Sequence, residues 1–468
     1  MTAPAPERLS FRLAETLTSL KPGDLPADVL DAAAVSLVDQ VGVALGGAGL
    51  GEGCGAFADL ARCEGGTPQS TLLGFGGRVP AAAAASVNGA LAHALDYEDS
   101  VDGLPVHPHA QVVPAALALA EAHDLDGAAL LASIAVGCDL TCRLAAATGT
   151  ELAGHGWYPP PLAGALGATV ASAHLLALGP GHTVDALSLV LMQMGAPGEI
   201  KYSPRSLVRG IRDGFGANAA VRAVQLAAAG IRGFDAPLEG RAGFFATHVS
   251  GQYRPEALLD GLGETFAGPR VSYKPWPSCR GTHSFLEAAL DLRDEAVPAG
   301  IEAIDLAGAP VNVMLAEPPE AKRAPASAID AKFSLPFTVA TAFVDGRVDL
   351  GSFTSLERSE VLELARRVTF TADPAWDVPD RMTSARMTVR LRDGRVLHRR
   401  IDVPLGNPSR PLSDDALRAK FAACARHAPQ PPPDPAQLAA DLRGIAREPS
   451  VRAVLGRHLP EETRCPSN

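Results

Sequence analysis

The sequence predicts a mainly α-helical protein in which a large all-helical domain is joined to a smaller α+β domain. From residue 8 to about residue 265, apolar residues recur at helical spacing in one segment after another. After Gly268-Pro269 the pattern changes, and short segments alternate apolar and polar residues as strands do. The 468 residues, of which 47% are hydrophobic, suffice for two such domains with a sizeable core.

The helical domain is expected to comprise residues 1–267 and 405–468. Leu25-Pro-Ala-Asp28 opens a helix, because apolar residues follow it at helical spacing as far as Val41. Further helices are predicted at about 80–97, 111–124, 126–147, 161–177, 183–195 and 214–230. Many of them are Ala-rich on more than one face, which suits close packing inside a large bundle.

The α+β domain is expected to span residues 268–404. Alternation predicts strands at 311–315, 385–391 and 395–403, and Asp393-Gly394 predicts a hairpin turn between the last two. Helices are predicted at about 282–296, where Ser284 and Glu287 have capping-box spacing, and at 334–344.

The C-terminal segment returns to helix and is expected to pack on the first domain. One helix is predicted at 413–427, and Asp434 with Pro435 caps a last one near 435–446.

Composition and charge restrict the function. A net charge of −11 argues against a nucleic-acid partner, and a site for an acidic substrate must gather its own cations. The seven cysteines are scattered, with no CxxC pair and no secretory segment, so free thiols in the cytoplasm are expected. No apolar run is expected to reach membrane-spanning length, and no membrane association is predicted.

The most informative segment runs from residue 88 to residue 109. Carboxylates and imidazoles gather there beside an apolar core, where they are costly to desolvate, which indicates proton chemistry or ion binding. The groups are Asp96, Glu98, Asp99, Asp102, His93, His107 and His109. Helical spacing would place Asp96 on the same face as His93 and as Ser100. His107, near a helix N-terminus, is expected to be a neutral general base, whereas Glu98 and Asp99 are expected to be solvated.

A metal site is the alternative interpretation of this segment. It would be built from His93, Asp96, His107 and His109. Their spacing matches no familiar ligand pattern, and no metal or other cofactor is predicted.

Three further segments offer groups for binding an acid. Residues 201–212 carry Lys201, Arg205, Arg209 and Arg212, which form either a cradle for substrate carboxylates or solvated surface charge. In residues 274–283, Lys274, Arg280 and His283 lie at the start of a predicted helix, where they form an anion site or an incidental cap. Cys279 is expected to be a small packed side chain. Tyr158 belongs to a rigid turn or presents its phenol to a cleft.

These motifs resemble the MmgE/PrpD family over more than 300 residues. The matching motifs are Leu25-Pro, Leu37-Val-Asp39-Gln-Val-Gly42, residues 88–107, Gly164-Ala-Leu-Gly167, residues 238–245, Lys274-Pro-Trp-Pro-Ser-Cys279-Arg-Gly-Thr-His283 and Ala331-Lys-Phe-Ser-Leu-Pro-Phe337. The resemblance implies a helical domain with an α+β lid, an active site between them, homodimerisation and cofactor-free chemistry.

The resemblance also implies roles for particular residues. Asp96, Ser100, His107, Lys274 and Cys279 occupy positions at which decarboxylase-like members place active-site groups. The chain departs from the family at three points. Trp157-Tyr158-Pro159 replaces a frequent Phe-His-Pro, Arg209 stands where a lysine is expected, and the histidine that decarboxylases use near Cys279 is absent, although a cysteine there is common elsewhere in the family.

The sequence is therefore interpreted as a dehydratase-like, cofactor-independent lyase or isomerase that moves a proton α to a carboxylate or carbonyl of a small acid. The predicted catalytic residues are His107, Asp96, Tyr158 and Lys274. The predicted substrate-binding residues are Ser100, Arg209, Arg212, Cys279, Arg280 and His283. The alternatives are an epimerase or cyclase of a specialised biosynthetic pathway and a scaffold homologue with a degraded site.

Overall fold

The chain divides into two compact units in the computed structural model, which describes residues 8–203, 206–378 and 383–459. Unit 1 runs to Val271 and resumes at Leu417, and unit 2 comprises Ser272–Ala416. Unit 1 is helical and unit 2 is mixed α+β, so the predicted fold class is confirmed.

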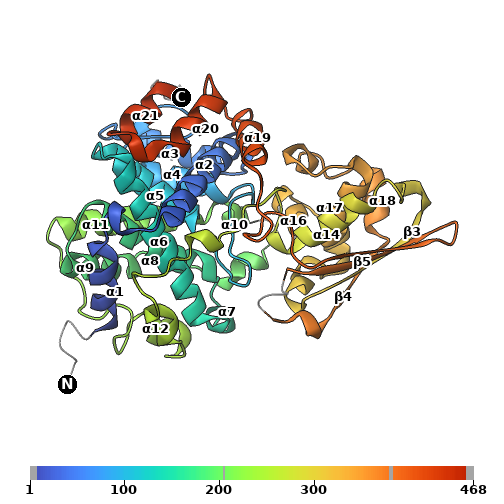
Figure 1. The fold of residues 1–468 in the computed structure, drawn as a ribbon, viewed down its shortest axis with the longest axis horizontal. Helices are drawn as coiled ribbons and strands as arrows, with labels where there is room; N and C mark the ends of the chain where they lie inside the picture. Colours follow the sequence, from blue (N-terminus) through green and yellow to red (C-terminus); the bar gives the residue numbers. More distant parts are fainter. Residues whose placement is uncertain (1–7, 204–205, 379–382, 460–468) are drawn as a thin grey trace. The chain divides into compact units, whose positions relative to one another are not determined.

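Unit 1 is a bundle in which α8 packs against α5, α6 and α11 (Figure 1). Its helices are α1 (Leu9–Ser19), α2 (Ala27–Leu50), α3 (Cys54–Glu64), α4 (Ala81–His93), α5 (His109–Ala122), α6 (Gly127–Thr148), α7 (Glu151–Gly154), α8 (Pro159–Leu175), α9 (Pro180–Leu191), α10 (Val208–Ile211), α11 (Asp213–Ala228), α12 (Phe244–Val249), α13 (Pro255–Leu259), α19 (Asp414–Ala425), α20 (Pro435–Arg443) and α21 (Val451–His458). Two short strands, β1 (Ser70–Thr71) and β2 (Arg78–Val79), pair antiparallel. All the helices predicted for this region are present, and Asp434 caps α20 by accepting from the Gln437 amide at 3.0 Å.

Two helices, α2 and α6, are long and apolar enough to cross a membrane, contrary to the expectation that no segment reaches that length. However, 78% and 89% of their most apolar windows are buried inside the fold. That burial gives both helices the role of core helices, whose apolar side chains stabilise the bundle.

Small residues let α19 approach α2 closely, and Figure 1 draws the two helices side by side in red and blue. Gly42 faces the ring of Phe421, and Gly46 faces Cys424. At Gly49 a Cβ would lie 1.6 Å from the carbonyl oxygen of His427, so no larger residue fits there without a backbone shift. This packing places the C-terminal segment against the same helix that reaches the candidate site.

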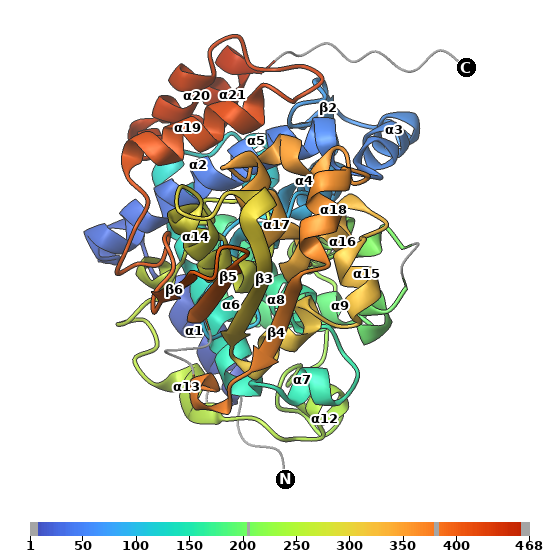
Figure 2. The same cartoon turned by 90° about the vertical axis from the view of Figure 1, so that its right-hand side faces the viewer.

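Unit 2 is built on a four-stranded sheet in the order β4-β3-β5-β6 (Figure 2). The strands are β3 (Ile301–Gly308), β4 (Val368–Ala372), β5 (Ala385–Leu391) and β6 (Val396–Ile401), and only the β3–β4 pair is parallel. The helices are α14 (His283–Leu292), α15 (Pro319–Arg323), α16 (Ala328–Lys332), α17 (Leu335–Asp345) and α18 (Ser359–Ala365). The hydrophobic core lies between the sheet and α14 and α17.

The sequence predicted this sheet only in part. The hairpin of β5 and β6 is confirmed, and Gly394 in its turn has a φ of 88°, which glycine adopts readily. The strand predicted at 311–315 is wrong, because Pro310–Leu315 forms a 3-10 helix in which Val311 and Val313 are exposed instead of covering a sheet. Strands β3 and β4 were not predicted.

The capping box predicted for α14 is also wrong. The helix begins at His283, so Ser284 already lies inside it. The Glu287 carboxylate instead accepts from the Leu405 amide at 2.9 Å and pairs with Arg410 at 2.6 Å. Its role is to hold the segment that follows β6.

Candidate active site

The candidate site lies in unit 1, in the loop that joins α4 to α5. Helix α4 ends at His93, and the Asp96 amide donates to the His93 carbonyl at 2.8 Å. Asp96 itself has a φ of 48°, in the left-handed region, which ends the helical path. The prediction that Asp96 and Ser100 share a helix face is therefore wrong, although both side chains are buried here.

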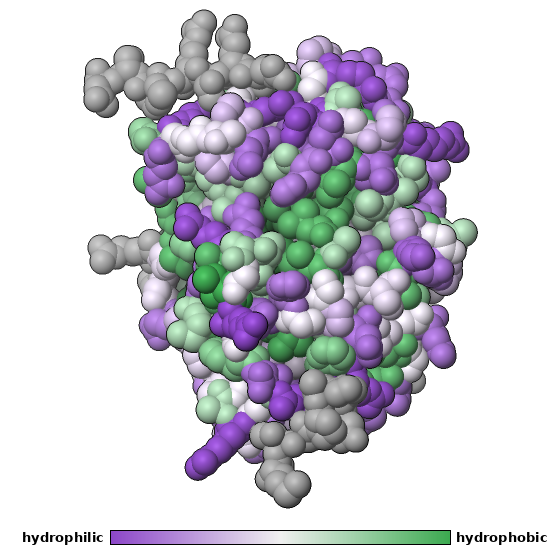
Figure 3. Space-filling model, turned by 90° about the vertical axis from the view of Figure 1, so that its left-hand side faces the viewer, coloured by the Kyte–Doolittle hydropathy of each residue, from purple (hydrophilic) through white to green (hydrophobic). Residues whose placement is uncertain are grey.

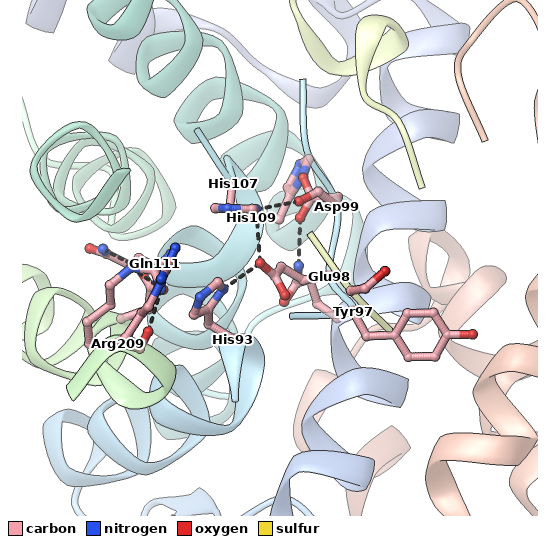
Figure 4. A network of polar contacts seen from close by, with 12 residues as sticks. His93, Tyr97, Glu98, Asp99, His107, His109, Gln111 and Arg209 are labelled. Carbon is pink, nitrogen blue, oxygen red and sulfur yellow. Dashed lines mark hydrogen bonds and ion pairs between the residues drawn. The ribbon is translucent and has the colours of Figure 1, made fainter. Parts of the chain in front are cut away.

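Glu98 is the centre of this site (Figure 4). Its Oε1 lies 2.5 Å from Nδ1 of His93 and 2.9 Å from Nδ1 of His107, and the two imidazole rings are 5.1 Å apart. The prediction that Glu98 and Asp99 are solvated is wrong, because neither residue is exposed to solvent. A buried carboxylate needs such partners to offset the loss of water.

Asp99 fixes the other side of the loop through three hydrogen bonds. Its Oδ1 accepts from Nε2 of Gln40 on α2 at 2.7 Å, and its Oδ2 faces Nδ1 of His109 at 2.8 Å. Its backbone carbonyl lies 2.9 Å from Nδ1 of His107. The aspartate therefore links α2, the loop and the start of α5.

These contacts define the tautomer of His107. A carbonyl oxygen only accepts hydrogen bonds, so Nδ1 of His107 must carry the proton that it donates to Asp99, and Nε2 then carries the basic lone pair. The side chain of His107 is 16% exposed, whereas those of His93 and His109 are 0% and 1% exposed. Among these three imidazoles, His107 is therefore the most accessible to solvent.

The surroundings of His93 shift its pKa downward. Burial lowers its pKa, the positive charge of Arg212 lowers it further, and Glu98 acts in the opposite direction. Burial acts to lower the pKa of Arg212 as well. The net shift is nevertheless upward, because electrostatic interactions outweigh burial, namely those with Asp213, Tyr158, Glu98 and Asp96. The guanidinium is thus a fixed positive charge next to the histidines and carboxylates.

Residues 201–212, the segment rich in Lys and Arg, contact the ring of Tyr158 through Arg212 and Lys201. The Cζ of Arg212 lies 5.0 Å from the centre of the Tyr158 ring, and Nζ of Lys201 lies 5.3 Å from it. Arg212 donates from Nη1 to the Arg209 carbonyl at 2.5 Å. Its Nε lies 3.6 Å from Oδ2 of Asp213, in a buried ion pair. Its Nη2 is buried without a hydrogen-bond partner among the residues that the structure describes, so Nη2 is available to a carboxylate.

Of the predicted cradle, Arg209 and Arg212 are both buried and lie on or beside α10, whereas Arg205 falls outside the described residues. Arg212 connects the cradle electrostatically to Glu98 and Asp96. Gln111 supports this arrangement, because its Nε2 donates to Oδ1 of Asp213 at 2.7 Å. The reading of these arginines as solvated surface charge is wrong.

The remaining predicted residues lie together in unit 2. Lys274 is fully buried, and the Cys279 amide donates to the Lys332 carbonyl at 3.0 Å. The fully buried His283 has Nε2 at 3.1 Å from the Ser278 carbonyl, and its Nδ1 lies 3.3 Å from Nη1 of Arg280. With both ring nitrogens occupied, His283 supports Arg280 and has no nitrogen left for a substrate.

Four side chains of the site could hold a metal ion by proximity alone. His93, Asp96, Glu98 and His107 each place one potential ligand atom within 4.8 Å of the others. The metal site considered from the sequence had His109 in place of Glu98, but Nδ1 of His109 is hydrogen-bonded to Oδ2 of Asp99. A proton on each imidazole Nδ1 accounts for the close approach to Glu98, and the charge of Arg212 opposes a further cation. The hydrogen bonding therefore favours proton chemistry over metal binding.

The sequence analysis missed two residues that build the site. Glu98 was assigned to solvent, and Gln40 was not considered at all. Glu98 had a local signal, since it stands five residues after His93 in a segment rich in both residue types. Gln40 had none beyond its place in a family motif, because it meets Asp99 from 59 positions away.

Comparisons with known proteins cover most of the chain. The sequence matches the MmgE/PrpD N-terminal domain over residues 11–256 and the MmgE/PrpD C-terminal domain over residues 276–441. It is 26% identical over 449 residues to a cis-aconitate decarboxylase-like protein of Aspergillus oryzae, covering 90% of this chain and 91% of the relative. It is also 25% identical over 434 residues to a cis-aconitate decarboxylase of Aspergillus terreus, covering 86% of each. A cis-aconitate decarboxylase of Mus musculus is 28% identical over 366 residues, covering 74% of this chain and 72% of the relative.

Proposed function

Because the chain belongs to the MmgE/PrpD family and is a lyase or isomerase of that type, we propose that it catalyses proton transfer on a small acid. The proton is moved at the carbon α to a carboxylate or carbonyl of that acid, and the enzyme uses no cofactor. The observation that carries this proposal is the setting of His107. Its Nδ1 is committed to the Asp99 carbonyl and to Glu98, and it is the most exposed imidazole of the cluster.

The step begins with Nε2 of His107 as the base. It accepts the proton from the substrate carbon, which leaves an imidazolium and a carbanion delocalised as an enolate. The imidazolium is stabilised by Glu98, which already accepts from its Nδ1 at 2.9 Å. Such a positioned base contributes about 10²–10⁴-fold to a rate.

The second half of the step decides the reaction class. In a dehydration, the enolate expels a β-hydroxyl, which takes up the proton and leaves as water. In an isomerisation, a proton returns to the carbon from a second acid, for which we propose Tyr158. A decarboxylation differs from the first step on, because loss of CO₂ itself creates the carbanion, and His107 must start as the imidazolium in order to deliver the proton. All three outcomes use the same imidazole.

Negative charge on the substrate needs cations, which the acidic protein must supply locally. We propose that Arg212, with an open donor at Nη2, binds a substrate carboxylate, and that Arg209 contributes positive charge. The charge-holding role predicted for Lys274 stays a prediction. A Lys274→Met variant with a raised KM would support it.

The experiment is a screen of di- and tricarboxylic acids for solvent-deuterium exchange, followed by NMR. Wild-type protein should exchange the α-hydrogen of at least one acid, or convert it. His107→Asn keeps a donor at the position of Nδ1 but removes the base, so it should lower the exchange rate by about 10²-fold or more. Retained exchange in this variant would contradict the role of His107.

The alternative of another class is a scaffold homologue with a degraded site. Binding of citrate-like acids separates the two, since negligible binding by wild type and by His107→Ala alike would favour the scaffold. Measurable binding by wild type that Arg212→Met abolishes would favour the enzyme, because Arg212 is the open guanidinium of the site.

We also propose that the protein is a homodimer. Figure 3 shows hydrophobic residues gathered into a patch on one face of the molecule. Large hydrophobic side chains of unit 1 are exposed, among them Leu60, Met192 and Phe215. Hydrophobic residues gathered into one patch, as in Figure 3, are typical of an interface. Sedimentation velocity should give the mass of two chains, and a monomer at micromolar concentration would contradict the proposal.

A further inference from the structure

One buried lysine of unit 1 has no part in the proton transfer proposed above. Lys420 lies on α19, and its side chain is only 4% exposed. Its Nζ lies 2.6 Å from Oδ1 of Asp39 on α2 and donates to the backbone carbonyl of Tyr97 at 2.7 Å. It also lies 4.2 Å from the centre of the Tyr97 ring. A buried ammonium with this many partners orders the groups around it.

Lys420 and Gln40, the residue next to its partner Asp39, hold the two residues that flank Glu98. Lys420 fixes Tyr97 by its carbonyl, and Gln40, which follows Asp39 on α2, fixes Asp99 by its carboxylate at 2.7 Å. The residue between these two anchors is Glu98, whose Oε1 contacts both His93 and His107. Asp39 and Gln40 on α2, together with Lys420 on α19, therefore set the position of the Glu98 carboxylate.

The charges of this region support the same conclusion. Asp39, the carboxylate that pairs with Lys420, also interacts electrostatically with two further buried carboxylates, those of Glu98 and Asp99. Burial raises the pKa of Asp39, and Asp99 and Glu98 raise it further, while Lys420 lowers it. Without the lysine, the carboxylates would repel one another across a medium that screens them poorly.

We infer that Lys420 and Asp39 form a positioning pair that holds the Tyr97–Asp99 segment and thereby sets the geometry of Glu98 and His107. The pair acts through the Tyr97 carbonyl and touches no reacting atom. The C-terminal segment thus serves the site as well as the core, since α19 provides Lys420. For its effect on catalysis the inference rests on the proposed function, but its effect on the imidazoles is independent of it.

The experiment compares Lys420→Met, Lys420→Arg and the double variant Asp39→Asn/Lys420→Met. The double variant leaves no isolated buried charge, so it should fold even if Lys420→Met does not. The matched control is Asp139→Asn/Arg143→Met, which neutralises another buried ion pair of unit 1, 2.6 Å long, that does not contact the loop.

Two measurements follow these variants. The first is the set of downfield imidazole N–H proton signals in the NMR spectrum, which report the hydrogen bonds of His93, His107 and His109 to Glu98 and Asp99. The second is kcat and KM for the acid found in the exchange screen. We expect Lys420→Met and the double variant to lose or shift these signals and to lower kcat by about 10–100-fold, because a misplacement of about 1 Å has effects of that size. KM should change less than threefold, and Lys420→Arg should restore part of kcat.

Unchanged signals in the double variant would overturn the inference. So would equal losses in the control pair, since these would show a general loosening of the bundle. If no acid is turned over by wild type, the proposed function fails, yet the proton signals still decide whether Lys420 positions the histidines.

Discussion

The carboxylate that bridges two imidazoles makes Glu98→Gln the most direct probe of the site. Glutamine has the same shape, and its amide oxygen can still accept from Nδ1 of His93 and of His107. The substitution removes the negative charge that would stabilise His107 once it has taken up a proton. Catalysis should therefore suffer more than folding.

The expected size follows from the contact of 2.9 Å between Glu98 and His107. A hydrogen bond to a charged group contributes about 1.5–3 kcal/mol, against about 1 kcal/mol for a neutral pair, so the loss in the transition state is about 0.5–2 kcal/mol. At about 1.4 kcal/mol for each factor of ten, kcat should fall by about 2–30-fold. The free energy of unfolding should change by less than about 1 kcal/mol, because the uncharged amide is cheaper to bury.

The assay is the initial rate of deuterium exchange into the acid identified by the screen, with thermal unfolding measured on the same samples. Glu121→Gln is the matched control, since Glu121 is equally buried but accepts from the Thr71 amide at 2.7 Å and pairs with Arg78 at 3.4 Å, away from the histidines. If both variants retained wild-type kcat, or lost it equally, the assignment of Glu98 to the site would be refuted.

Three further outcomes can be measured without a substrate or with simple additions. Burial lowers the pKa of His174 below its ordinary 6.5, so the unfolded chain binds a proton more readily than the folded chain does, and the free energy of unfolding should fall as the pH drops below about 6.5. The variant His174→Gln retains a donor for the Leu20 carbonyl but has no group that titrates. Urea titrations at pH 7 and pH 5.5 should therefore show a smaller decrease for this variant than for wild type. Gly49→Ala should lower the free energy of unfolding by about 1–3 kcal/mol because its Cβ meets the His427 carbonyl, whereas Gly55→Ala, with open space around it, should be neutral or stabilising. Incubation with a chelator followed by gel filtration should leave the exchange rate unchanged, and loss of activity restored by one divalent metal would instead favour a metal ion at the histidine–carboxylate cluster.

The helical part of the fold could be predicted from local pattern because helices are made by near neighbours in sequence. The apolar spacing that predicted a helix at 126–147 is satisfied within α6 itself, and the Asp434 cap forms with a residue three positions away. The hairpin of β5 and β6 follows from Asp393-Gly394 for the same reason.

The strands that pair over long distances were harder to predict. Strand β3 lies between β4 and β5, which come more than 50 residues later, so its own sequence carries little of the information that makes it a strand. At 310–315 the alternation of apolar residues predicted a strand, but the segment forms a 3-10 helix with a proline at its start.

The sequence by itself determined which reactive groups the chain contains, namely the histidines and carboxylates of residues 93–109 and the arginines near residue 210. It also determined the family, which the comparisons confirm. The tertiary structure decided which of these groups leave water. Glu98 and Asp99 look like a solvated helix end in sequence, yet both are buried, with partners on α2, α4 and α5 and in the loop itself. Lys420 reaches the same loop from 323 residues away. Burial depends on what packs over a residue and not on its neighbours in the chain, and burial is what turns an acidic segment into a set of oriented imidazoles.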